Sequence, residues 1–247
     1  MTFKVVIPAR YNSARLPGKP LIEIGGVPMV IHVARKAKLS GANEIIIATD
    51  DDRIAKTSEE YGFISFMTNP NHISGTDRIE EVIDKANWDS ETIVINLQGD
   101  EPLIDPLLIN QIAEGMIKNN IDYASAASLF LNYEDFSNTN NVKVILDYND
   151  YAIYFSRAMI PHQKDLQEKS ISKFVYHHIG IYGYTVEFLR KFCNLPTSNL
   201  ELTEKLEQLR AIENNLKLKI FKYQGTHSIG VDTEEDLKKI KKILDPT

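Results

Sequence analysis

The sequence predicts one α/β domain with a mixed, mostly parallel sheet that is covered by helices on both faces. Short apolar runs, typical of strands buried on both sides, alternate with amphipathic helical segments through the first half of the chain. This alternation favours a parallel sheet between two helical layers. The 247 residues suit one large domain, and 43% hydrophobic with 25% charged residues is ordinary for a folded chain with a sizeable core.

The first half of the chain supplies these elements in order. Residues 3–8 form a nearly continuous apolar run, and residues 28–41 follow with apolar side chains at helical spacing. Farther along, Asp105 as N-cap and Pro106 in the first turn are typical of a helix start. We predict strands at residues 3–8, 44–50, 63–68 and 92–100, and helices at residues 28–41, 52–62, 74–86 and 105–119.

The pattern changes in the second half. Residues 142–156 are predicted to form a hairpin around Asn149 and Asp150, which are typical turn residues. A β-rich insertion at about 130–185 is expected to serve a partner subunit. The remaining predicted elements are strands at residues 123–130, 176–184 and 216–223, and helices at residues 202–215 and 233–244.

Composition excludes several classes of function. The net charge of −6 argues against nucleic-acid binding by bulk electrostatics. The single cysteine, Cys193, excludes an intrachain disulfide and a cysteine-based metal cluster. No stretch approaches the roughly 18 apolar residues of a membrane span, and the first apolar run is too short for a signal peptide. We therefore expect a cytoplasmic protein that binds neither nucleic acid nor membrane.

A basic loop follows the first predicted strand. Residues 8–21, "PARYNSARLPGKPL", place Arg10, Arg15 and Lys19 among turn residues. Open α/β sheets bind ligands at the carboxyl ends of their strands, so this loop's amides and cations could wrap a polyphosphate. The spacing fits neither a Walker A loop nor the dinucleotide-binding glycine pattern. The alternative is a basic surface loop of ordinary turn residues.

Two carboxylates are candidate metal ligands. Asp100 follows the fourth predicted strand in "LQGDEP", and Mg²⁺ prefers carboxylate oxygens and substrate phosphates. Gly99 beside it allows close approach of the backbone. Asp232, in "GVDT", is the second candidate. The alternatives are a strand-to-loop turn at residues 99–100, and capping of the last helix by Asp232 or Thr233.

These stretches belong to a longer ordered series. The sequence continues with "SGTDRIEEV", "NLQGDEPLI", "NNVKVILD", "YAIYFSRAMIP", "HHIGIYGY", "LELTEKLEQLR" and "GVDTEEDL". Over nearly all 247 residues, this succession resembles the 3-deoxy-manno-octulosonate cytidylyltransferase (CMP-Kdo synthetase) family. The resemblance implies a Rossmann-like nucleotidyltransferase fold in one domain, residues 1–247, and a homodimer with an interface that includes the insertion at about 130–185.

The resemblance also implies a reaction. CMP is transferred from CTP to the anomeric hydroxyl of 3-deoxy-D-manno-octulosonate (Kdo), which gives CMP-Kdo and pyrophosphate with Mg²⁺ as cofactor and supports lipopolysaccharide biosynthesis. A related acidic sugar, 8-amino-Kdo or sialic acid, stays open as the acceptor. Glycosyl transfer from a ready-made sugar nucleotide and non-catalytic nucleotide binding are the other classes of function that we weigh.

The resemblance assigns roles to individual residues. Arg10, Arg15, Lys19 and Asp100 are the expected catalytic residues, and Asp100 and Asp232 the expected metal ligands. The expected CTP-binding residues are Pro8, Ala9, Arg10, Ser13, Arg15, Lys19, Ser74, Gly75, Thr76 and Gln98. The expected sugar-binding residues are Arg78, Gln98, Arg157, His178, Tyr182, Glu207 and Gln208.

Several of these residues also have plain structural interpretations. An arginine such as Arg157 would position the carboxylate of an acidic sugar and discriminate against neutral sugars. His178 and Tyr182 lie four residues apart, so they should share one face of a strand, where packing alone could also hold them. Ser74 can serve as a helix cap, and Glu207 can belong to the solvated face of its helix.

Overall fold

The structure is a computed structural model that describes residues 2–12, 16–162, 171, 173–225 and 230–245. Its strands are β1 (Phe3–Ala9), β2 (Glu23–Ile24), β3 (Val27–Pro28), β4 (Glu44–Thr49), β5 (Ile64–Met67), β6 (Ile93–Asn96), β7 (Tyr123–Leu129), β8 (Lys143–Leu146), β9 (Ala152–Ser156), β10 (Val175–Thr185) and β11 (Lys219–Lys222). Its helices are the 3-10 turn η1 (Lys19–Leu21), α1 (Met29–Lys38), α2 (Asp52–Glu60), α3 (Gly75–Ala86), α4 (Pro106–Asn119), α5 (Tyr133–Ser137), α6 (Val186–Cys193), α7 (Asn199–Glu204), α8 (Leu209–Glu213) and α9 (Glu234–Leu244).

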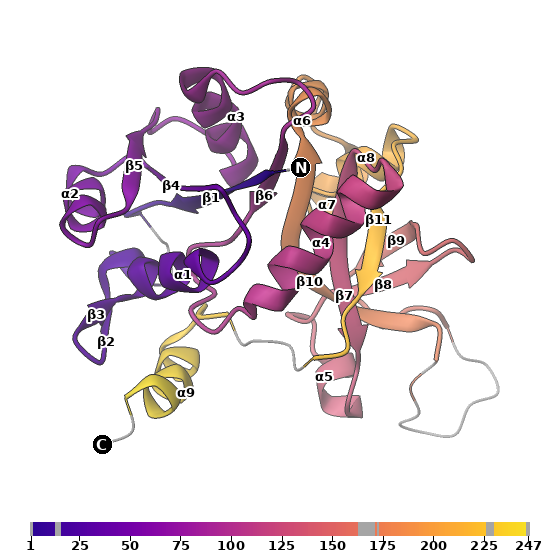
Figure 1. The fold of residues 1–247 in the computed structure, drawn as a ribbon. Helices are drawn as coiled ribbons and strands as arrows, with labels where there is room; N and C mark the ends of the chain where they lie inside the picture. The colour runs from indigo at the N-terminus through magenta and orange to yellow at the C-terminus, as the bar shows by residue number, and fades with distance from the viewer. Residues whose placement is uncertain (1, 13–15, 163–170, 172, 226–229, 246–247) are drawn as a thin grey trace.

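One mixed sheet runs through the molecule in the order β11-β7-β10-β6-β1-β4-β5 (Figure 1). β1 pairs parallel with β4 and β6, β4 with β5, and β7 with β11. β10 is antiparallel to both of its main neighbours, β6 and β7. The predicted mixed, mostly parallel sheet is therefore confirmed, with β10 as the strand that joins its two parallel parts.

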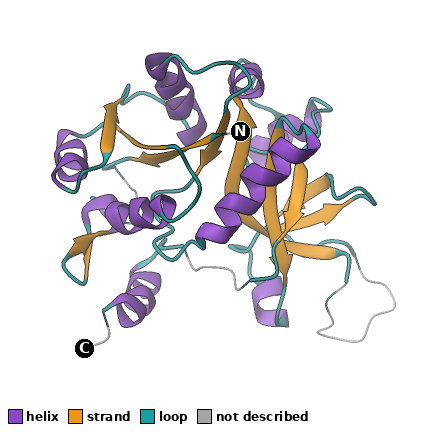
Figure 2. Ribbon diagram, viewed as in Figure 1, coloured by secondary structure: helices purple, strands orange, loops and turns teal. Residues whose placement is uncertain are grey.

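Helices cover both faces of this sheet (Figure 2). On one face, apolar side chains of α1 and α4 pack against inward residues of β1 such as Val5 and Ile7. On the other face, α3 and α6 pack against Val6 and its neighbours. Alternate residues of β1 thus enter opposite cores, as the two-residue period of a strand requires. The continuous apolar run at the start of the sequence is the signature of this double burial.

The β8–β9 hairpin forms as predicted, with Asp150 at φ 60° in its turn. β8 pairs with the first part of β10, and the second part of β10 lies in the central sheet. The β-rich region at about 130–185 is therefore continuous with the core rather than separate from it. Within the described residues, no helix is long and apolar enough to cross a membrane.

One predicted helix, residues 202–215, is wrong in detail. The structure has two short helices there, α7 and α8, separated by Lys205 at φ 55°. Glu204 ends α7 because its carboxylate accepts hydrogen bonds from the Ser156 hydroxyl at 2.6 Å and from the Arg157 amide at 2.9 Å. This tertiary contact overrides a sequence of good helix formers. It leaves Glu207 and Gln208 in the connection between the two helices rather than on a helix face.

Glu81, on α3, provides a prediction about stability. Partial burial raises its pKa, but hydrogen bonds from Lys85, the Asn69 amide and His72 outweigh this effect and lower the pKa from 4.5 to about 2. The ionised carboxylate therefore stabilises the fold above the unfolded pKa of about 4.3, and this stabilisation is lost as the pH falls toward 2. In urea unfolding, Glu81→Gln should lower stability most above about pH 5, and the difference from the unmodified protein should shrink between about pH 4.5 and 2.

Glu60 provides the control for this measurement. It pairs with Lys56 at 3.9 Å, and both side chains are well exposed, so Glu60→Gln should change stability little at any pH. A loss of stability in Glu81→Gln that stays constant across the acid range would contradict the assignment.

Candidate active site

A basic turn follows β1 and brings Lys19 to the end of the sheet. Gly18 adopts φ 69°, a left-handed conformation that suits glycine, and its amide donates to the Tyr11 carbonyl at 2.9 Å. η1 begins with the next residue, so Lys19 is fixed at the start of a short rigid element. Its ammonium donates to Asp100 Oδ2 at 2.6 Å, to the Val231 carbonyl at 2.7 Å and to Asp232 Oδ1 at 3.3 Å.

Asp100 reaches this ammonium from the loop after β6. A Cβ on the neighbouring Gly99 would lie 2.9 Å from the Pro8 carbonyl, so only glycine allows β1 and this loop to approach so closely. The Val231 amide donates to the Asp100 carbonyl at 2.9 Å, which ties the C-terminal segment to the same loop. Three segments distant in sequence therefore meet at the carboxyl ends of β1 and β6.

Asp232 contributes the second carboxylate. Thr233, rather than Asp232, caps α9: its hydroxyl accepts from the Asp236 amide at 3.2 Å, in a capping box. The Asp232 side chain is thus available to contact Lys19. About half of that side chain, 54%, is exposed, compared with 30% for Asp100 and 13% for Lys19. The two predicted metal ligands and one predicted phosphate ligand lie together, as the sequence interpretation requires.

The loop before α3 lies beside this cluster. A Cβ on Gly75 would contact the Pro8 ring at 3.3 Å, which places the start of α3 against the end of β1. Ser74 caps α3 in a capping box with Asp77, so the structural interpretation of this serine holds. Arg10 is exposed and donates to the Ile73 carbonyl at 3.3 Å. Ser13 and Arg15, also predicted here, lie outside the described residues.

Glu207 and Gln208 extend the site from the other side. The Thr76 hydroxyl donates to Glu207 Oε2 at 2.5 Å. Burial raises the pKa of Glu207, and hydrogen bonds from Thr76 and Ser74 oppose that shift. Glu207 Oε1 and Gln208 Nε2 are buried and have no hydrogen-bond partner among the described residues, and the Arg210 guanidinium lies 3.8 Å from Glu207 Oε1. A buried polar atom left unpaired is costly, and a hydroxyl-bearing ligand would satisfy both atoms.

His178 and Tyr182 share one face of β10, as predicted. A register shift between Ile179 and Tyr182 adds two residues to β10, which keeps both side chains on the same side. Their ring centroids lie 5.5 Å apart. The Ser125 hydroxyl lies 2.9 Å from His178 Nε2, and burial raises the pKa of Tyr182, so its hydroxyl stays protonated at neutral pH.

Arg157 lies at the end of β9. Its Nε donates to the Glu204 carbonyl at 3.0 Å, and its Nη1 to the Thr139 carbonyl at 3.3 Å. Lys143 is fully buried, and its ammonium donates to the Arg157, Asn138 and Asn141 carbonyls at 2.7 to 2.9 Å. Burial, together with the Arg157 charge, lowers the pKa of Lys143.

Sequence reasoning missed Glu204 and Lys143 as residues that hold Arg157. The only local signal was a lysine in the middle of the apolar run "VKVIL", where a surface charge is out of place. Gln98 is half-buried after β6 and donates to Asn96 Oδ1 at 3.0 Å.

Arg78 lies in the interior of the protein. The side chain is fully buried and donates to Asp50 Oδ2 at 2.8 Å and to the Thr68 hydroxyl. The structure thus shows Arg78 in an internal ion pair at the ends of β4 and β5, and its contact with the sugar stays a prediction.

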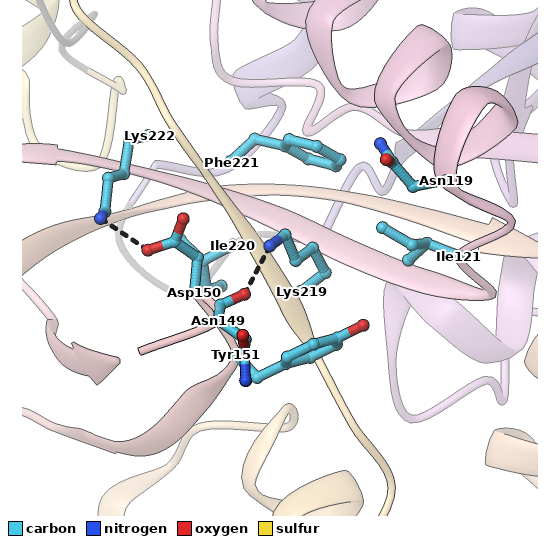
Figure 3. Close-up of a pocket in the computed structure, with 9 residues that line it drawn as sticks. All are labelled: Asn119, Ile121, Asn149, Asp150, Tyr151, Lys219, Ile220, Phe221 and Lys222. Carbon is cyan, nitrogen blue, oxygen red and sulfur yellow. Dashed lines mark hydrogen bonds and ion pairs between the residues drawn. The ribbon is translucent and has the colours of Figure 1, made fainter. Parts of the chain in front are cut away.

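A surface pocket elsewhere contains none of the predicted site residues. It measures about 580 Å³ and lies beside β11 and the β8–β9 turn (Figure 3). Its two lysines are paired: Lys219 donates to the Asn149 carbonyl and Lys222 to Asp150, both at 2.5 Å. The convergence around Lys19 is the stronger candidate for the site of chemistry.

The arrangement suits transfer between two anionic or hydroxyl-bearing substrates. Cations and carboxylates gather at the ends of β1 and β6, where a polyphosphate and a hard metal ion could be bound. Next to them lies a group of largely buried polar side chains, Tyr182, Glu207 and Gln208. The two parts meet at Thr76, in the first turn of α3, which donates to Glu207 and follows Gly75, the residue packed against Pro8.

Comparison with known proteins identifies relatives over the whole chain. Residues 4–220 match the family described as cytidylyltransferase. The chain is 42% identical to the 3-deoxy-manno-octulosonate cytidylyltransferase of Haemophilus influenzae, and the match covers 99% of both proteins. It is 43% identical to the protein of the same name from Vibrio parahaemolyticus, over 99% of this chain and 98% of that protein.

Solved structures share the fold. A CMP:2-keto-3-deoxy-manno-octonic acid synthetase complexed with CTP superposes with a TM-score of 0.91 at 35% identity, and the match covers 100% of this chain and 99% of the other. A cytidylyltransferase from Leptospira borgpetersenii superposes with a TM-score of 0.67 at 18% identity, over 100% of this chain and 88% of the other. The second likeness concerns the fold alone. The predicted Rossmann-like nucleotidyltransferase fold is confirmed.

Proposed function

The chain belongs to the cytidylyltransferase family, and on that premise we propose that it transfers CMP from CTP to the anomeric hydroxyl of Kdo, with release of pyrophosphate. The observation that carries the proposal is the meeting of Lys19, Asp100 and Asp232 at the carboxyl ends of β1 and β6. Full-length relatives with this activity in their names support the same acceptor. The product would supply lipopolysaccharide biosynthesis.

The proposed role of the basic turn is to hold the triphosphate. Nucleotidyl transfer needs the attacking oxygen, the α-phosphorus and the leaving pyrophosphate in line, and it needs the negative charge of the phosphates neutralised. Arg10 and Lys19 supply cations at the end of β1, and Arg15 supplies a third from the same loop in the sequence. Charge developing on pyrophosphate as it leaves is stabilised by these groups.

Mg²⁺ is the proposed cofactor, held by Asp100 and Asp232. The donor set fits: a cationic group, the Lys19 ammonium, already contacts an oxygen of each carboxylate at 2.6 and 3.3 Å. Mg²⁺ prefers such carboxylate oxygens together with substrate phosphates. When bound, the metal would polarise the α-phosphate and lower the pKa of the attacking hydroxyl. Lys19 would then transfer its hydrogen bonds from the two carboxylates to the phosphates.

The proposed sugar site is formed by Arg157, His178, Tyr182, Glu207 and Gln208. Kdo carries a carboxylate beside its reacting carbon, and the Arg157 guanidinium would pair with it. Glu207 Oε1 and Gln208 Nε2, which lack a hydrogen-bond partner among the described residues, would bind hydroxyl groups of the sugar. Gln98, near the end of β6, would contact either the cytosine or a sugar hydroxyl.

Gln208→Ala should weaken sugar binding selectively. The side chain is 3% exposed, and its Nε2 atom has no hydrogen-bond partner among the described residues, so the substitution removes a donor without breaking a hydrogen bond that Nε2 makes to any of them. We expect the KM for Kdo to rise about tenfold, since one hydrogen bond in a desolvated site contributes roughly 1–2 kcal/mol. The KM for CTP should stay unchanged in steady-state kinetics. A rise in the KM for CTP alone would contradict the sugar assignment.

Pyrophosphate release tests the proposed function. The assay combines the protein, Mg²⁺ and CTP, with and without Kdo, and uses ATP, GTP and UTP as controls. Release that requires both CTP and Kdo is the expected result. Release with 8-amino-Kdo or sialic acid but not with Kdo would contradict Kdo as the acceptor and would still support CTP as the donor. Binding of CTP without release, whatever the sugar, would indicate a non-catalytic module.

We also propose a cytoplasmic homodimer that uses the β-rich region as its interface. Four apolar side chains of this region and of the adjoining end of β7 have half or more of their surface exposed: Leu129, Leu131, Ile153 and Met159. Burial of such side chains against a second copy is favourable. Sedimentation at micromolar concentration should give a dimer, and Leu131→Asp should shift it to the monomer. A monomer in the unmodified protein would refute the proposal.

A further inference from the structure

One face of α3 holds the segment that leads into the nucleotide site. Arg78, Glu81 and Lys85 are spaced three and four residues apart, so they lie along one side of the helix. Each contacts residues 67–72: Arg78 the Thr68 hydroxyl, Glu81 the Asn69 amide and His72, and Lys85 the Met67 carbonyl. The segment is therefore attached to α3 by side-chain hydrogen bonds.

Burial contributes little to holding this segment. Between residues 67 and 73, Thr68 is the only buried residue, while Met67 is 40% and Ile73 89% exposed. Thr68 is fixed to the end of β4, because its amide donates to the Thr49 carbonyl at 2.8 Å and its hydroxyl donates to the same oxygen at 2.9 Å. The buried polar contacts of the segment therefore meet at Thr68, which is bonded both to the Thr49 carbonyl and to Arg78.

Arg78 makes this anchor an ion pair as well. Its Nη2 donates to Asp50 Oδ2 at 2.8 Å, and the exposed fractions of the two side chains are 0% and 13%. One guanidinium thereby links the end of β4, the end of β5 and the first turns of α3. A planar fork with several donors can serve two acceptors at once, whereas a lysine ammonium is a single point of charge on a flexible stem.

The anchored segment ends on two groups of the proposed nucleotide site. The Ile73 carbonyl accepts from Arg10, and Ser74 begins the capping box of α3. Gly75 packs against Pro8. A shift of residues 69–73 would therefore displace the partner of Arg10 and the amides at the start of α3 together.

We propose that Arg78 is a positioning residue for the nucleotide site: through Asp50 and Thr68 it fixes the 69–76 segment, and through the Ile73 carbonyl it fixes Arg10. Arg78 itself contacts neither substrate. This inference rests on the proposed function only in taking CTP as the ligand. Its structural part, the anchoring of the segment, is independent of any reaction.

Three variants of the ion pair test the proposal: Arg78→Gln, Arg78→Lys, and the double variant Asp50→Asn/Arg78→Gln. Arg78→Gln leaves the Asp50 carboxylate unpaired and so also lowers stability. The double variant removes both charges and should recover much of that stability while the segment remains unanchored. Val82→Ala, whose side chain packs into the apolar core one turn after Arg78, is the control that lowers stability through a cavity without removing any of the hydrogen bonds to the segment.

The first readout is amide hydrogen exchange in the absence of ligand. Exchange at residues 69–76 should accelerate in all three variants and stay unchanged in Val82→Ala. The second is the Kd for CTP, measured by calorimetry in Mg²⁺. It should rise about tenfold in Arg78→Gln and in the double variant, less in Arg78→Lys, and not in Val82→Ala.

The third readout is a double-mutant cycle with Arg10→Ala. If Arg78 acts through Arg10, the two substitutions should raise the Kd for CTP less together than the product of their separate effects. If the rise in the Kd for CTP with both substitutions equals the product of the two separate rises, Arg78 does not act through Arg10.

Other outcomes separate the possible failures. A fall in thermal stability with normal exchange at residues 69–76 and an unchanged Kd for CTP would make Arg78 a purely structural residue. A rise in the KM for Kdo at an unchanged Kd for CTP would contradict the proposal and would support a direct contact between Arg78 and the sugar. If the unmodified protein does not bind CTP, the proposed function fails, while hydrogen exchange still decides whether Arg78 anchors the segment.

Discussion

Asp100→Asn should reduce the rate of CMP transfer by about a thousandfold, the scale expected when a group that organises transition-state charge is lost. The substitution keeps the shape of the side chain and its contact with Lys19 but removes the negative charge. A neutral amide binds a hard divalent cation poorly, so the proposed metal site would lose one of its two protein ligands. The measurement is kcat for pyrophosphate release over a range of Mg²⁺ concentrations, where high Mg²⁺ should restore part of the activity.

The chain contains a closely matched control for this substitution. Glu44 pairs with Lys4 at 3.0 Å and is 28% exposed, compared with 2.6 Å and 30% for Asp100 with Lys19. Glu44 lies at the opposite end of the sheet, where β4 begins. Glu44→Gln should therefore leave kcat and its Mg²⁺ dependence unchanged. Equal activity of Asp100→Asn and the unmodified protein would exclude Asp100 from the site.

Lys19→Met should lower kcat/KM for CTP by about a hundredfold or more, because an ammonium that neutralises phosphate charge is replaced by an apolar group of similar length. A second effect follows from the pairing in the structure. Without the ammonium, Asp100 and Asp232 face one another without a counter-ion, so the ligand-free protein should bind Mg²⁺ more tightly. Thermal unfolding with and without Mg²⁺, in the absence of CTP, measures this as a larger stabilisation by the metal.

Lys4→Met is the control for both effects. It removes a lysine from a comparable pair, and neither the kinetics with CTP nor the stabilisation by Mg²⁺ should change. If Lys19→Met loses activity while its response to Mg²⁺ stays normal, Lys19 would bind phosphate without acting as a counter-ion to the carboxylates.

Local sequence signals predict the nucleotide half of the site well, since its residues follow strands directly. β1 and β6 are short apolar runs, and the carboxyl ends of adjacent strands in an α/β sheet are close in space. The proximity of Lys19 and Asp100 could therefore be predicted from the sequence. The sequence did not show whether Asp232 or Thr233 caps the last helix, and in the structure Thr233 is the cap.

The sugar half depends on tertiary contacts that sequence patterns do not carry. The break between α7 and α8 follows from the attachment of Glu204 to β9, and nothing in residues 202–215 signals it. The burial of Arg78 likewise depends on Asp50 and Thr68, which lie on two other elements. A motif can identify such a residue without revealing whether it faces a ligand or the interior.

The antiparallel strand β10 separates two parallel parts of the sheet. Strands β6, β1, β4 and β5 run parallel on one side of it, and β7 with β11 on the other. The nucleotide contacts proposed here come mainly from the first side, and Arg157, Glu207 and Gln208 come from segments that follow β7 in the chain. Donor and acceptor recognition are therefore encoded in largely separate stretches of the gene product. In evolution, the acceptor could change by substitutions after β7 while the choice of nucleotide stayed fixed.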